Sequence, residues 1–175
     1  MLIFFFYSFL LSFLISCSPE VTPPIPSSNY PAALQQAQQE NKPIFLYLTC
    51  YGCMGYDEFY RDLIKEAAVV KILSKEYIFV ELYVDDRAAL NLNQDWKTWV
   101  AQHYPDSIQQ LFLTAKNTGQ FNAHFQRLQF QKLNNPLYVL LSPQEQLLLP
   151  AFGYSQKNPL LFLEKLQEGL DNYHQ

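Results

Sequence analysis

The sequence predicts an α/β fold in which one mixed β-sheet is covered by helices on both faces. Two apolar runs, residues 44–49 and 77–84, have the length and the β-branched and aromatic side chains of buried strands. A helical pattern lies between them, and strand, helix, strand without a tight turn is a crossover between parallel strands. A third apolar run, a turn and an amphipathic helix follow at the C-terminus. Such an order places helices on both sides of a single sheet.

The first half of the chain supplies two helices around the first strand. Residues 31–41 form a helix with a modest apolar face, which ends at Asn41 and Lys42 because the residue before Pro43 avoids helical geometry. Residues 57–74 are helical, as one helix or two shorter pieces, with apolar side chains three or four apart. Asp57 and Glu58 lie in its first turn, where negative charge is favoured.

Residues 85–133 are the least regular part of the chain. Helices are predicted at 95–102 and 119–130. Trp96 and Trp99 could form a partner-binding surface, but core packing is the better interpretation. Asp85 and Asp86 could be an acid pair, but at a strand end they are interpreted as the solvated start of a loop.

The C-terminal third predicts a hairpin and a closing helix. A strand at residues 137–141 is followed by a turn that contains Pro143, and then by an antiparallel strand at 146–149. Asn158 is a good N-cap and Pro159 a good first helical residue.

A Cys-x-x-Cys pair, Cys50 and Cys53, stands where the first strand ends and the next helix begins. That placement is typical of a redox site, since the partial positive charge of a helix N-terminus stabilises a thiolate. At a turn the two Cα atoms can come within the roughly 4.4–6.8 Å that a disulfide allows. In an extended strand they would be about 10 Å apart, and the sequence leaves both possibilities open.

The two cysteines have two other possible interpretations. They could be small buried residues without chemistry. A structural zinc site needs four ligands, and the histidines, His103, His124 and His174, show no ligand spacing. The histidines are therefore expected at the surface or half-buried, and no metal or cofactor is predicted.

The N-terminus predicts export and lipidation. Residues 2–15 are apolar but shorter than the roughly 20 residues of a membrane span, which suits a signal peptide. The run ends in Leu-Ile-Ser-Cys, which resembles a bacterial lipobox and makes Cys17 the expected lipidation site, although the first basic residue is Lys42. The alternatives are an uncleaved anchor and an ordinary signal peptide. The expected organisation is a signal peptide at 1–16, a lipidated cysteine and proline-rich linker at 17–29, and one domain at 30–175.

Composition and cysteine count agree with this organisation. The chain has 175 residues, a formal net charge of −4 and no basic run, which argues against a nucleic-acid partner. It has three cysteines, so lipid on Cys17 would leave Cys50 and Cys53 as an even pair in a compartment where disulfides persist.

Four segments carry a resemblance to a known family. In order, KPIFLYLTCYGCMGYDEF, VVKILSKEYIFVELYVDD, GQFNAHFQ and NNPLYVLL resemble the C-terminal thioredoxin-like domain of the thiol:disulfide interchange protein DsbD, over about residues 32–170. The resemblance implies a thioredoxin-like fold, with an insertion before the strand that begins at a cis-proline.

The resemblance also implies site residues. Cys53 falls on the attacking cysteine of the family pattern, but the second cysteine would fall at position 56, where this chain has Tyr56. Cys50 is then the candidate resolving cysteine. Pro136 is expected to be cis and close to Cys53, with Asn135 presenting a backbone edge to the substrate chain. Tyr56 would orient groups near Cys53 or pack over the site.

Two function classes follow. One is a thiol:disulfide oxidoreductase, anchored in the bacterial cell envelope with its domain in the periplasm or another extracytoplasmic space. Its partners would be proteins with exchangeable disulfides and, by resemblance, a DsbD-like membrane electron donor. The other is a redox-inactive binding module that uses the proline groove to hold a partner protein. The sequence leaves open whether Cys53 works with Cys50 or with an external thiol.

Overall fold

The centre of the molecule is a mixed sheet of three strands. The computed structural model describes residues 22–53, 58–153 and 158–175, so Cys17, the predicted signal peptide and Tyr56 lie outside the described residues. Within them, β1 (Ile44–Thr49) lies between β2 (Ile78–Tyr83), to which it is parallel, and β3 (Leu137–Leu141), to which it is antiparallel. The predicted fold class is confirmed, and the strands begin and end within a residue of the predicted bounds.

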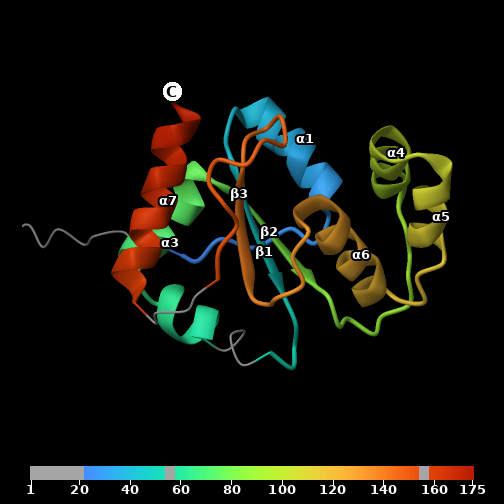
Figure 1. Cartoon of the computed structure of the whole chain (residues 1–175). Helices are drawn as coiled ribbons and strands as arrows, with labels where there is room; N and C mark the ends of the chain where they lie inside the picture. Colours follow the sequence, from blue (N-terminus) through green and yellow to red (C-terminus); the bar gives the residue numbers. More distant parts are fainter. Residues whose placement is uncertain (1–21, 54–57, 154–157) are drawn as a thin grey trace, which may run out of the picture.

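Helices cover both faces of this sheet (Figure 1). In chain order they are α1 (Tyr30–Glu40), the short π-helix η1 (Phe59–Leu63), α3 (Ala67–Glu76), α4 (Gln94–His103), α5 (Asp106–Leu113), α6 (Thr118–Phe130) and α7 (Pro159–Tyr173). Residues 58–76 are thus two pieces, one of the two predicted arrangements. Asn158 caps α7 by accepting a hydrogen bond from the Leu160 amide, at 3.0 Å, as predicted.

Alternation along the strands divides the core in two. On one face, Leu46 of β1, Val80 of β2 and Val139 of β3 pack with side chains of α1, α4 and α6. On the other, Phe45 and Tyr138 pack with side chains of η1, α3 and α7. The core residues include Trp96 and Trp99, which are 7% and 4% exposed, so their predicted core placement is confirmed.

Two edge segments differ from the sequence prediction. Residues 146–149 do not form a strand; the chain beside β3 makes isolated bridges at Leu147 and Phe152 instead. Pro150, which has no amide hydrogen to donate, lies between these bridges. At the opposite edge, Ser27 of the predicted linker joins the sheet, since its amide donates to Phe79 O and its carbonyl accepts from Glu81 N, at 2.9 and 3.0 Å.

α5 is the helix that the sequence pattern did not predict. Phe112 is its buried residue, and Ile108 is partly buried against the same core, so the helical spacing of Ile108, Leu111 and Phe112 could have indicated this helix. None of the helices within residues 22–53, 58–153 and 158–175 is long and apolar enough to cross a membrane.

Candidate functional site

The two cysteines face each other across a tight turn at the end of β1. A disulfide joins Cys50 and Cys53, whose Cα atoms are 5.2 Å apart, and the Cys53 amide donates to the Cys50 carbonyl at 3.1 Å. The geometry that the sequence left open is therefore the turn and not the extended strand. Both cysteines are half-buried, while Tyr51 and Gly52 between them are exposed.

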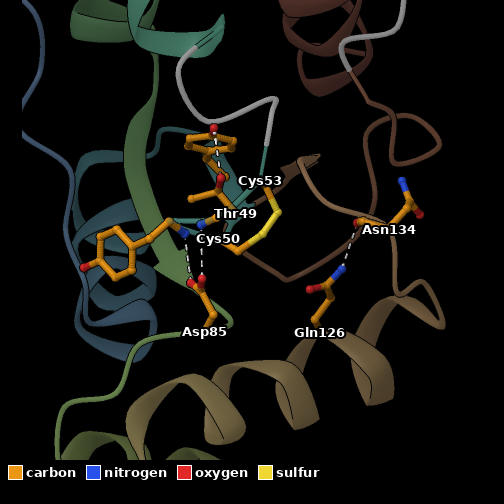
Figure 2. Close-up of a disulfide and its surroundings, with 9 residues drawn as sticks. Thr49, Cys50, Cys53, Asp85, Gln126 and Asn134 are labelled. Atoms are coloured by element: carbon orange, nitrogen blue, oxygen red, sulfur yellow. Dashed lines mark hydrogen bonds between the residues drawn. A yellow bond between two sulfur atoms is a disulfide. The ribbon is translucent and has the colours of Figure 1, made fainter.

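The carboxylate of Asp85, in the loop that follows β2, holds this turn (Figure 2). Its Oδ1 accepts from the Tyr51 amide at 2.9 Å and its Oδ2 accepts from the Gly52 amide at 3.2 Å. Asp85 is exposed at a loop start, as predicted, but its role in holding the turn was missed. The register of the folded sheet explains the contact: Thr49 pairs with Tyr83 in the parallel ladder, so residues 51 and 85 leave the sheet at the same edge.

An aromatic pair lies beside the turn. The rings of Tyr51 and Tyr83 stack with centroids 4.1 Å apart and planes 13° apart, and Tyr51 is 58% exposed. Tyr51 is one of the two residues between the cysteines, so this stack places an aromatic surface directly next to the disulfide.

The proline expected to face the cysteines immediately precedes β3. The Asn135–Pro136 peptide bond is cis, which confirms that prediction. Leu137 pairs with Leu48, so Pro136 precedes β3 at the edge of the sheet where β1 runs into Cys50. The distance from Pro136 to Cys53 stays a prediction. The Asn135 Oδ1 atom is buried and has no hydrogen-bond partner in the described part of the chain.

α6 supports the loops on both sides of the disulfide. The buried Asn122 side chain donates to Tyr83 O at 2.9 Å, just before the Asp85 loop. One turn further along, the buried Gln126 side chain donates to Asn134 O at 3.1 Å, just before the cis-proline (Figure 2). The segment GQFNAHFQ contains both side chains, but nothing in its pattern distinguishes them from ordinary surface amides.

A buried carboxyl lies on the sheet face that η1 covers. Glu81 of β2 is 7% exposed, and its Oε2 accepts from the hydroxyl of Tyr60 in η1 at 2.8 Å. Burial raises the pKa of Glu81, and hydrogen bonds from Tyr60 and Tyr83 partly oppose this. The bond to Tyr60 ties η1, the first described helix after the cysteines, to the sheet. This group was missed from the sequence, although a glutamate inside the apolar run YIFVELYV could have indicated a buried carboxyl.

The sequence predicts that Cys53 lies at the N-terminus of a helix, whose partial positive charge would stabilise its thiolate. Residues 54–57 lie outside the described residues, and Glu58 is the first helical residue described after them. The placement of Cys53 at a helix end therefore stays a prediction, as does the role of Tyr56.

The histidines show no sign of a role at the cysteine turn in the described part of the chain. His103 bonds to Trp99 O at 2.7 Å and to Glu145 Oε2 at 2.8 Å, and burial lowers the pKa of His124. Within the described ranges, no three or more His, Cys, Asp or Glu side chains group as metal ligands would.

Comparison with known proteins now identifies the family. The model of a thioredoxin-like family matches residues 25–143. A solved structure titled DsbH oxidoreductase is similar in fold, with a TM-score of 0.58, 16% sequence identity, and coverage of 90% of this chain and 92% of its own. A search of curated proteins gives no significant match. Since the family match spans well over half of the chain, from before α1 through the cysteine turn to the end of β3, the chain belongs to the thioredoxin-like family.

Proposed function

We propose that the protein is a thiol:disulfide oxidoreductase in which Cys53 and Cys50 exchange a disulfide with partner proteins. The observation that carries this proposal is the Cys50–Cys53 disulfide, closed in a turn at the edge of the sheet where the Asn135–Pro136 cis bond precedes β3. A thioredoxin-like domain with a close Cys-x-x-Cys pair is suited to thiol:disulfide exchange.

The exchange proceeds in two balanced steps. The Cys53 thiolate attacks one sulfur of a partner's disulfide, so a mixed disulfide forms and the partner's other sulfur leaves as a thiolate. The Cys50 thiolate then attacks the Cys53 sulfur, closes the Cys50–Cys53 disulfide and releases the partner's second thiolate. The partner gains two electrons and the protein loses two. Asn135 and Pro136 align the partner chain.

The electrons return through a membrane donor. The four segments that resemble the C-terminal domain of DsbD support a DsbD-like protein as that donor, which would reduce the Cys50–Cys53 disulfide by the reverse exchange. The apolar leader, the lipobox-like Leu-Ile-Ser-Cys and the prolines of residues 18–29 support a lipid anchor on Cys17. The domain would then work in the periplasm or another extracytoplasmic space, tethered to a membrane by the proline-rich segment.

The two cysteines have different roles, and trapping tests them. Cys50→Ser should accumulate mixed disulfides with partner proteins, because Cys53 attacks and nothing in the chain resolves the product. Cys53→Ser should abolish them. The measurement is non-reducing electrophoresis after acid quenching and alkylation, with the double variant as the control for non-specific oxidation. If Cys53→Ser traps partners and Cys50→Ser does not, the assignment is reversed.

A redox-inactive binding module is the competing function, favoured by Tyr56 at the position where the family pattern has its second cysteine. Under that alternative neither single variant traps a partner, and the wild-type pair does not cycle between thiols and disulfide across a series of redox buffers. Partner binding would then be the same with the wild type and the double variant.

A further inference from the structure

We propose that Asp85 is a positioning residue that sets the redox equilibrium of the Cys50–Cys53 pair, by holding the turn between the two cysteines in its closed form. This inference rests on the proposed function and deepens it, since it concerns how readily the same pair is oxidised and reduced.

The first support is the geometry of the carboxylate. Its two oxygens accept separately from the amides of Tyr51 and Gly52, the two residues that separate the cysteines. Together with the bond from Cys53 N to Cys50 O, every described amide from Tyr51 to Cys53 is bonded within the turn or to Asp85. Hydrogen bonds to an ionised acceptor are stronger than those between neutral groups. Asp85 therefore restrains the backbone that brings the two sulfur atoms together.

The second support is that the Asp85 backbone is itself held in place. On the side of the sheet, Val84 N donates to Thr49 O at 2.8 Å, which links the loop to the residue just before Cys50. On the other side, Gly119 N donates to Asp86 O at 2.8 Å, and a Cβ on Gly119 would lie 2.8 Å from the Asp85 carbonyl carbon. α6, which contains Gly119, thus packs so closely on the backbone of Asp85 and Asp86 that only glycine fits at this position. Because the backbone around Asp85 is held on both sides, its carboxylate can restrain the turn between the two cysteines.

The consequence concerns the reduced protein more than the oxidised one. In the oxidised protein the disulfide itself keeps the turn closed. In the reduced protein the turn is kept closed by hydrogen bonds, and Asp85 supplies two of them. Loss of these bonds lets the two thiols separate, which lowers their effective concentration and makes the disulfide less stable. A carboxylate next to the turn also disfavours a thiolate, so removal of its charge acts in the same direction.

The test is the redox equilibrium of the pair in glutathione buffers. One disulfide and two glutathione thiols give two cysteine thiols and one glutathione disulfide, and the reduced fraction is measured by alkylation and mass shift. Asp85→Ala should lower the equilibrium constant for disulfide formation about tenfold, which is about 30 mV toward easier reduction. Asp85→Asn should shift it in the same direction by a smaller factor, because one amide oxygen can still accept.

The matched control is Asp86→Asn. It removes the same charge from the adjacent residue, and its Oδ1 can still accept from Ala88 N, as it does at 2.8 Å in the wild type. It should leave the equilibrium within a factor of two. An equal shift in Asp86→Asn and Asp85→Asn, or no shift in Asp85→Ala, overturns the inference. A wild-type pair that does not titrate at all overturns the proposed function instead, so the two failures are distinct.

Discussion

At the scale of single residues, the group with the clearest consequence for stability is the carboxyl of Glu81. It is buried on the apolar face of β2, and burial raises its pKa because an ionised carboxylate is poorly solvated there. A raised pKa means that the folded protein binds this proton more tightly than the unfolded chain does. Stability therefore falls as the pH rises from the ordinary value of 4.5 through the raised pKa.

The corresponding prediction is that Glu81→Gln removes this loss. A glutamine keeps an acceptor for the hydroxyl of Tyr60 but cannot ionise, so wild type should lose stability relative to the variant as the pH increases from about 4.5 to neutral. Urea unfolding at a series of pH values measures the difference. Glu164→Gln, at an exposed position on α7, is the control and should track wild type. Parallel curves for wild type and Glu81→Gln would show that burial does not perturb this carboxyl.

Residues that act through their own chemistry could be predicted from the sequence, and residues that act through placement could not. Cys50, Cys53 and the cis bond at Pro136 follow from a motif and a family resemblance. Asp85 binds the cysteine turn because β1 and β2 are parallel and in a particular register. That register is a property of the folded sheet, so an exposed aspartate after a strand could not be told from an ordinary loop residue.

At the scale of elements, α6 positions the loops around the disulfide. Gly119 packs against the Asp85 loop, while Asn122 and Gln126 bond to the carbonyls of Tyr83 and Asn134. These three residues are three and four apart, so they lie on one face of the helix. The sequence predicted this helix from its apolar side chains, which face the core. The contacts to the loops involve a glycine and two amides, for which periodicity gives no signal.

Gly119→Ala tests this packing. Alanine in place of glycine in a helix is ordinarily stabilising by about 0.5–1 kcal/mol. Here the added methyl group meets the backbone of Asp85 and Asp86, so the variant should instead lose about 1–3 kcal/mol of unfolding free energy. Hydrogen exchange of the Tyr51 and Gly52 amides should accelerate as the Asp85 loop moves.

The control on the same helix is Arg127→Ala, at an exposed position. It should leave both the stability and the exchange of the Tyr51 and Gly52 amides close to wild type. A stabilised Gly119→Ala with unchanged exchange would mean that the loop yields without cost, and that α6 does not fix the position of Asp85.

At the scale of the whole molecule, the sheet has an additional bridge beside β2 that the sequence did not indicate. Ser27 pairs with the outer side of β2, so the proline-rich segment docks on the domain before it ends. The sequence could not show this, because one bonded residue among prolines and serines has no apolar alternation. The reach of the proposed tether is then set by the residues before Ser27.

Lipidation of Cys17 is tested by detergent-phase partitioning of the full chain. Wild type should enter the detergent phase, and Cys17→Ala should move to the aqueous phase or keep an uncleaved leader. Cys50→Ser is the control, since it also removes one thiol but not the proposed lipid site, and it should partition like wild type. Identical partitioning of wild type and Cys17→Ala, with residues 2–15 retained on the mature chain, would contradict the lipoprotein proposal.

The spacing of Gly119, Asn122 and Gln126 along α6 limits how the chain can change length. Each residue of an α-helix turns about 100°, so one residue inserted between Asn122 and Gln126 would point one of them away from its loop. The hydrogen bonds from α6 to Tyr83, Asp86 and Asn134 come from Gly119, Asn122 and Gln126. Residues 90–113, which include α4 and α5, take no part in these hydrogen bonds. Relatives that keep the two loops should therefore vary in length before α6 and be constant in length within it.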